Sequence, residues 1–139
     1  DRSIFKIVDL DEAWAFLNVA QGETLSNKLV RAGRAMNAGV YFVTQSSGDV
    51  SKESLKNNIG LKFSFRSTDT NEIKQTLEFF GLDSEDENNQ KRLRDLENGQ
   101  CLMQDLYGRV GVVQIHPVFE ELLHAFDTRP PIKSEVDLE

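Results

Sequence analysis

A predicted strand that ends in two carboxylates is the part of this sequence best suited to chemistry. Residues 7–12, Ile-Val-Asp-Leu-Asp-Glu, begin as an apolar run and end in Asp11 and Glu12. Ligands bind at the carboxyl ends of strands in open α/β sheets, and one carboxylate there can hold a Mg²⁺ ion, directly or through water. The other can orient or deprotonate a water molecule that attacks a phosphoryl group. This is the Walker B arrangement with a catalytic glutamate; the alternative is that both acids merely begin the helix predicted from Ala13.

A second predicted strand, at 40–44, also ends in polar residues, Thr44-Gln45-Ser46-Ser47. Because parallel strands end at the same edge of a sheet, Gln45 is predicted to reach the same reacting group as Glu12. A neutral amide can hold a γ-phosphate or its attacking water without adding charge. The alternative is an ordinary polar loop after a strand.

Two arginines lie between these strands. Arg31 and Arg34 are three residues apart, and are therefore neighbours on the predicted helix that ends near Ala38. A guanidinium group there can pair with phosphate oxygens, in the same subunit or across an interface. The alternative is a solvated basic face of the helix.

The elements that must position these residues follow from the spacing of apolar residues. The pattern predicts a short helix after Glu12, then a longer one from Thr24 after an interruption at Gly22, with a stripe formed by Leu25, Leu29, Ala32 and Met36. Further helices are expected at 51–58, 69–80, 84–98 and from Pro117, and further strands at 61–66, 100–106 and 110–115. This order predicts an α/β fold with a largely parallel sheet, flanked by helices and followed by a C-terminal β-hairpin and helix.

Three other features have structural rather than chemical interpretations. Trp14 is expected to pack against the sheet, and Cys101 to be a small core residue. Asp69 and Glu72, three residues apart, predict a capping box at a helix start. Ser84 and Glu87 predict another.

Composition limits the class of protein. The 139 residues are 39% apolar and have a formal net charge of −7, which excludes a disordered chain and argues against a nucleic-acid binder that uses its whole surface. Contacts to DNA would have to come from local arginines. The single cysteine suits a reducing cytosol, and no apolar run approaches the roughly 20 residues needed to span a bilayer.

Three motifs together resemble a known family. Asp-Glu-Ala-Trp at 11–14, Arg-Ala-Gly-Arg at 31–34 and Thr-Gln at 44–45 are similar to the large cytoplasmic ATPases of conjugative type IV secretion, the VirB-four class. These are RecA-like motor ATPases of the broader family that includes the FtsK and HerA DNA translocases. The resemblance runs from about Ile4 to Pro130 and includes the segments 99–103 and 105–109. It implies the C-terminal portion of a RecA-like P-loop ATPase domain, from the Walker B strand onward, at 1–130 and a tail at 131–139.

The resemblance also implies a role for each site residue. Asp11 would be the Mg²⁺-site acid, Glu12 the catalytic base and Gln45 the γ-phosphate sensor, with Thr44 beside it at the nucleotide. The candidates for an arginine that acts in trans are Arg31, Arg34 and Arg109; Arg109 is alternatively a plain turn residue. The implied cofactors are ATP and Mg²⁺. The implied partners are further copies of the chain in a ring and the membrane proteins of the secretion machine, with a location in the cytoplasm or at the inner face of the membrane.

One departure from the family pattern matters. The sequence contains no G-x-x-x-x-G-K-[ST] phosphate loop. We therefore expect the chain to be the carboxy-terminal part of a motor domain, which alone binds ATP weakly and hydrolyses none. Two alternatives remain open at this point, a DNA translocase of the FtsK and HerA kind and a non-catalytic interaction domain with the same fold.

Overall fold

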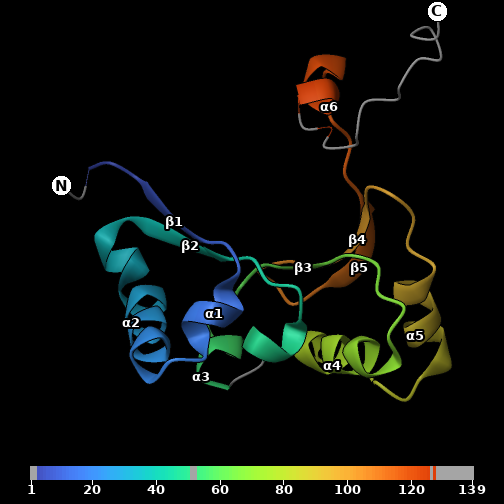
Figure 1. Cartoon of the computed structure of the whole chain (residues 1–139), viewed down its shortest axis with the longest axis horizontal. Helices are drawn as coiled ribbons and strands as arrows, with labels where there is room; N and C mark the ends of the chain where they lie inside the picture. The colour runs from blue at the N-terminus through green and yellow to red at the C-terminus, as the bar shows by residue number, and fades with distance from the viewer. Residues whose placement is uncertain (1–2, 51–52, 126, 128–139) are drawn as a thin grey trace, which may run out of the picture.

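The fold begins with a parallel pair of strands that sets the position of the predicted site. The computed structural model describes residues 3–50, 53–125 and 127 (Figure 1). Strand β1 (Lys6–Leu10) pairs in parallel with β2 (Ala38–Phe42), so that Lys6 lies opposite Ala38 and Leu10 opposite Phe42. The carboxyl ends of both strands therefore meet at one edge, as the sequence predicted.

Two helices connect these strands. Helix α1 (Ala13–Leu17) is followed by α2 (Ala20–Met36), which returns the chain to the start of β2. The prediction that Gly22 interrupts a helix was wrong, because α2 runs through it. Gly22 is instead a point of close approach: a Cβ atom there would lie 1.9 Å from the carbonyl oxygen of Phe16.

The face that α2 buries also differs from the predicted stripe. Leu25 and Met36 are 48% and 46% exposed, whereas Gly22, Ser26 and Gly33 are buried. These three small residues share one side of the helix and allow its backbone to approach α1 and β2 closely. Leu29 and Ala32 of the predicted stripe are half-buried, and Val30 packs against the core. Apolar spacing alone could not reveal the close approach, because the most buried described positions of α2 are glycine and serine.

A second sheet contains the remaining described strands. Strand β3 (Lys62–Ser64) pairs antiparallel with β4 (Gln100–Gln104), which pairs antiparallel with β5 (Val110–Gln114). The α/β class and the C-terminal hairpin are confirmed, but β3 is not the third strand of a parallel sheet. Its alternation of apolar and polar residues is typical of an antiparallel strand with one solvated face, and this pattern explains the correction.

The other helices follow β2 along the chain. They are η1 (Ser47–Val50), α3 (Glu53–Lys56), α4 (Thr70–Phe80), α5 (Glu87–Arg94) and α6 (Glu120–Ala125). Among the described residues, no helix is long and apolar enough to cross a bilayer. The predicted helix at 51–58 falls partly on residues 51–52, which lie outside the described residues, as do Phe126 and the tail from Thr128.

The predicted helix boundaries hold better for α4 than for its successors. Asp69 caps α4 by accepting a 2.8 Å hydrogen bond from the Glu72 backbone, and Gly81 ends it in a left-handed conformation, φ 74°. Helix α5 is capped by Asp86 rather than Ser84, because the Asp86 side chain accepts from the Asn88 backbone. Helix α6 begins at Glu120, three residues after Pro117.

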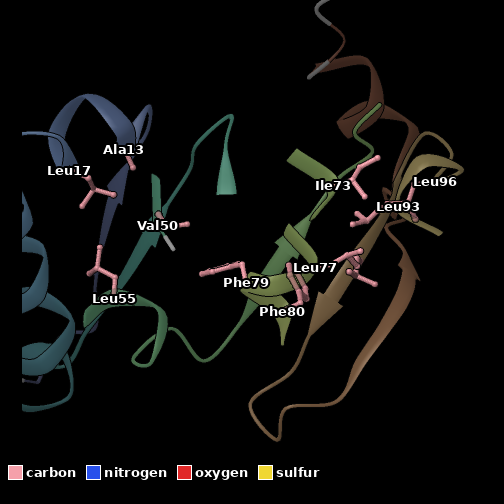
Figure 2. Packing of buried hydrophobic residues seen from close by; sticks show 11 residues of the cluster. Ala13, Leu17, Val50, Leu55, Ile73, Leu77, Phe79, Phe80, Leu93 and Leu96 are labelled. Carbon is pink, nitrogen blue, oxygen red and sulfur yellow. The ribbon is translucent and has the colours of Figure 1, made fainter. Parts of the chain in front are cut away.

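The core extends from α1 and α3 to α4 and α5 (Figure 2). As predicted, α4 buries one apolar face, and Leu93 and Leu96 hold α5 and the segment after it against the core. Cys101 is also fully buried, as expected, and burial raises the pKa of its thiol. The members of this cluster are Ala13, Leu17, Val50, Leu55, Ile73, Leu77, Phe79, Phe80, Leu93, Leu96 and Leu102.

The C-terminal end of α4 is bound to the elements beneath it by polar side chains. Lys56 donates to the carbonyl oxygen of Glu78 at 2.7 Å, Lys62 to that of Phe79 at 2.8 Å, and Gln104 to that of Phe80 at 3.3 Å. The bonds to Phe79 and Phe80 satisfy carbonyl groups that a helix end leaves unpaired, whereas the Glu78 carbonyl also accepts from the Gly81 N–H at 3.0 Å. Lys62 is buried, and burial, with a smaller contribution from nearby Lys56, lowers its pKa.

Candidate active site

The site lies where β1 and β2 end together. After the strand pairing, the Val43 N–H donates to the carbonyl oxygen of Leu10 at 3.0 Å, and the Ala13 N–H donates to that of Val43 at 2.8 Å. The first N–H of α1 is thus satisfied by the neighbouring strand. These bonds bring the chain at Glu12 alongside the chain at Gln45.

Glu12 and Gln45 are in direct contact. The Gln45 amide Nε2 donates to Oε1 of Glu12 at 3.0 Å, across 33 residues of sequence. The other oxygen of Glu12, Oε2, accepts a 2.6 Å hydrogen bond from the indole Nε1 of Trp14. The carboxylate is therefore held by one donor on each oxygen while it remains exposed at the sheet edge.

The alternative that the acids merely cap the next helix does not describe Glu12. It occupies the N-cap position of α1, but its side chain makes no capping hydrogen bond. Its backbone is left-handed, with φ 51°, which is uncommon for a residue other than glycine. In this left-handed conformation the Glu12 carboxylate contacts Gln45 and does not cap the N-terminus of α1.

Asp11 supplies a second, exposed carboxylate at the same edge. Its Oδ1 accepts a hydrogen bond from the Glu12 backbone at 2.9 Å. Its Oδ2 accepts no hydrogen bond from a described residue. No group of three or more His, Cys, Asp or Glu residues gathers for a metal in the described parts of the chain. Mg²⁺ is commonly bound by one or two carboxylates with waters and substrate phosphates, and the metal role of Asp11 stays a prediction.

Thr44 turns toward its own loop. Its hydroxyl donates to Oδ2 of Asp49 at 2.6 Å, and its oxygen lies 3.5 Å from the donating backbone N–H of Ser46. The contact between Thr44 and nucleotide stays a prediction, and the hydroxyl of this residue closes the loop after β2.

Two residues near the site were not assigned chemistry from the sequence. Trp14 is 46% exposed and binds Glu12 instead of packing against the sheet, so the packing prediction was wrong. Glu72 contributes its backbone N–H to the predicted cap, but its carboxylate accepts hydrogen bonds from Ser46 and Ser47. The only sequence signal for the Trp14 contact is its position two residues after Glu12. The sequence gives no signal for the Glu72 contacts, because Ser46 and Ser47 are more than 20 residues away.

The structure does not bring Arg31 to this edge. The last turn of α2 lies beside the start of the strands, where the carbonyl oxygen of Met36 accepts a 3.2 Å hydrogen bond from Lys6 (Figure 1). Arg31 is exposed and lies in the second half of α2, and no hydrogen bond joins it to a described residue of the site. The side chain of Arg34 lies outside the part that the structure describes. The pairing of Arg31 with phosphate, in the same subunit or across an interface, stays a prediction beside the alternative of a solvated basic face.

Arg109 forms part of the turn between β4 and β5. Its Nε donates to Oδ2 of Asp105 at 2.6 Å, and its guanidinium group lies 5.4 Å from the centre of the Tyr107 ring. Desolvation favours the neutral form of Asp105, but hydrogen bonds from Arg109 and the Tyr107 backbone outweigh it and lower the pKa of the carboxyl group. The side chain of Arg109 is 78% exposed, so it remains accessible to solvent.

Comparisons with known proteins agree with this architecture. A family model described as an AAA-like domain matches residues 1–126. The chain belongs to the AAA-like domain family and has an ATPase-type, P-loop NTPase fold. Over 119 residues it is 34% identical to the uncharacterized protein YddE of Bacillus subtilis (strain 168). The match covers 86% of this chain and 14% of that protein.

Proposed function

We propose that this chain is part of an ATP-hydrolysing motor that energises conjugative DNA transfer through a type IV secretion machine. The observation that carries the proposal is the 3.0 Å contact between the amide of Gln45 and the carboxylate of Glu12 at the shared edge of β1 and β2. Membership of the AAA-like domain family supports the ATPase part. The motifs at 11–14, 31–34 and 44–45 support the conjugative part by their resemblance to the VirB-four class.

In this proposal Glu12 is the general base. It orients the attacking water and accepts its proton as the water attacks the γ-phosphate. The indole N–H of Trp14 and the amide of Gln45 restrict the rotation of the Glu12 carboxylate. Gln45 also has a carbonyl oxygen, Oε1, that can accept a hydrogen bond from the same water.

Asp11 is the residue that would hold Mg²⁺. The ion would supply positive charge to the phosphate oxygens, which two adjacent carboxylates would otherwise repel. The chain contains no lysine-bearing phosphate loop, so the phosphate cradle has to come from another segment or subunit. An arginine from a neighbouring copy, with Arg31, Arg34 and Arg109 as candidates, would complete the site in an oligomeric ring.

The proposal is tested by Glu12→Gln in the complete protein. Removal of the general base should lower ATP turnover by roughly 10²- to 10⁴-fold and abolish transfer of a conjugative element between cells. The matched control is Glu121→Gln, an equal change of charge on an exposed carboxylate of α6, which should alter neither. If Glu12→Gln left turnover and transfer intact, a non-catalytic interaction domain would replace the proposed function.

A further inference from the structure

The carboxylate of Glu72 collects hydrogen bonds from the loop that carries Gln45. Its Oε1 accepts from the Ser47 backbone at 2.7 Å and from the Ser47 hydroxyl at 2.9 Å. Its Oε2 accepts from the Ser46 hydroxyl at 2.8 Å. Thr76, one turn further along α4, adds a 3.1 Å hydrogen bond to the Ser47 hydroxyl.

These bonds fix the chain directly after Gln45, while another bond fixes it directly before. Thr44 is tied to Asp49, so both neighbours of Gln45 are held by side chains of the loop or of α4. Gln45 itself is exposed, and its side-chain amide donates to Glu12. Its reach toward Glu12 therefore depends on where its two neighbours are fixed.

The place of Glu72 in α4 makes it a stable point of attachment. It lies in the first turn, where the helix N-terminus favours negative charge. The next residue, Ile73, and Leu77 on the same face are buried in the core. The charged end of Glu72 thus reaches the loop from a helix that cannot shift without disturbing the core.

We propose that Glu72 is a positioning residue for the hydrolytic site, because it sets the position of the Gln45 amide relative to the Glu12 carboxylate through Ser46 and Ser47. This inference rests on the proposed function for its effect on turnover, and on the hydrogen bonds alone for its effect on Gln45. Two measurements separate these parts.

The first measurement uses NMR spectra of the 139-residue chain. The side-chain amide of Gln45, and the indole N–H of the single tryptophan, report the two donors to Glu12. Glu72→Ala should shift the Gln45 amide signals toward those of an amide in water, and Glu72→Gln, which keeps one acceptor oxygen, should shift them less. Glu78→Ala is the matched control, because it removes a carboxylate from the same helix outside the loop contacts, and it should leave these signals in place.

The second measurement is ATP turnover by the complete protein. Misplacement of Gln45 should lower kcat by roughly ten- to a hundredfold in Glu72→Ala, with a much smaller change in KM for ATP and partial recovery in Glu72→Gln. If Glu72 had only a structural role, its substitution would lower the amount of active protein, and kcat would not be lower in Glu72→Ala than in Glu72→Gln.

The outcomes are distinct. If the Gln45 signals stay in place in folded Glu72→Ala, the positioning role is wrong, whatever the turnover. If they shift while kcat is unchanged and Glu12→Gln is inactive, the positioning of Gln45 does not matter for the reaction and the inference is again overturned. If Glu12→Gln itself keeps full turnover, the proposed function fails, and the spectra alone decide whether Glu72 places Gln45. If Glu72→Ala does not fold, the double variant Ser46→Ala with Ser47→Ala takes its place in both measurements.

Discussion

At the scale of single residues, Glu12 combines an uncommon backbone conformation with a fully engaged side chain. A left-handed residue other than glycine costs on the order of 1–3 kcal/mol, and here the turn directs the carboxylate to Gln45 and Trp14. An ordinary N-cap residue has an extended backbone and avoids this cost, and its carboxylate accepts from the first N–H groups of the helix. The conformation therefore supports the interpretation of Glu12 as a functional residue rather than a helix start.

Trp14 should matter for turnover more than for stability. In the complete protein, Trp14→Phe removes the donor to Oε2 of Glu12 but keeps an aromatic ring, so we expect kcat to fall roughly five- to thirtyfold, equivalent to about 1–2 kcal/mol. Because the side chain is 46% exposed, the free energy of unfolding of the chain should change by less than about 1 kcal/mol. Turnover assays and urea denaturation measure the two effects.

Trp14→His is the companion variant, because imidazole keeps a ring N–H. It should recover part of the turnover lost in Trp14→Phe. Equal activity in wild type and Trp14→Phe would show that the 2.6 Å bond to Glu12 has no role in the reaction.

The sequence allowed the meeting of Glu12 and Gln45 to be predicted, because both follow strands that were recognised from their apolar runs. It did not allow the hydrogen bonds of Trp14 or Glu72 to be predicted. The first depends on a left-handed turn, which local propensity disfavours. The second depends on how α4 packs against the loop after β2, and the motif Asp-x-x-Glu at 69–72 already had a sufficient local explanation as a cap.

At the scale of elements, close packing of backbones decides the position of α2. Gly22 and Gly33 permit it, because Cβ atoms there would lie 1.9 Å from the carbonyl oxygen of Phe16 and 2.7 Å from that of Ala38. The apolar stripe predicted for this helix was wrong at Leu25 and Met36, which are exposed, since the most buried described positions of α2 are backbone and small side chains. Helix α4, which buries large apolar residues, was predicted well.

Gly22→Ala gives a test in which two effects have opposite signs. Helix propensity alone would stabilise the protein by about 1 kcal/mol, whereas the clash with the Phe16 carbonyl should force α1 and α2 apart. We expect a net destabilisation of about 1–3 kcal/mol, measured as a lower midpoint of urea denaturation.

Gly111→Ala is its control. A Cβ atom at Gly111 meets nothing within 4 Å, so the unfolding free energy should change little. A stabilised Gly22→Ala variant would contradict the close approach of α1 and α2.

At the scale of the whole molecule, one face of the parallel pair of strands is exposed and mostly apolar, with the charged residue Asp9 opposite Tyr41. Phe5, Ile7, Tyr41 and Val43 are between 49% and 61% exposed, and their alternating positions place them on the same side of the sheet. Parallel sheets usually have both faces covered. An uncovered apolar face of this kind favours association in water.

We therefore expect the 139-residue chain to associate as its concentration rises and to bind an apolar dye. The double variant Ile7→Lys with Tyr41→Thr should weaken both, and its unfolding free energy should stay within about 0.5 kcal/mol of the wild type, as is usual for surface positions. Sedimentation and dye fluorescence measure the effect. Val118→Lys, at a residue that is 80% exposed near α6, is the control; an equal effect there would show that this face has no special role.

The whole-molecule arrangement was only partly predictable. The order of strands and helices, the parallel pair and the hairpin all follow from local patterns. The pairing of β3 with β4 could not be predicted from local patterns, because a three-residue strand carries little information about its neighbour. Its buried residue Lys62 also belongs to a type that is seldom buried. Its burial under α4 becomes understandable only with the carbonyl group of Phe79 in place.

Helix α4 is secured at both ends. Glu72 ties its first turn to the loop beside the site, and Lys56, Lys62 and Gln104 tie its last carbonyl groups to α3, β3 and β4. A helix that is held at both ends can pass a displacement of one end to the other end. In the motor proposed above, movement of the β3–β5 sheet would therefore displace the Gln45 loop through α4, and a ligand that moved Gln45 would displace that sheet in return.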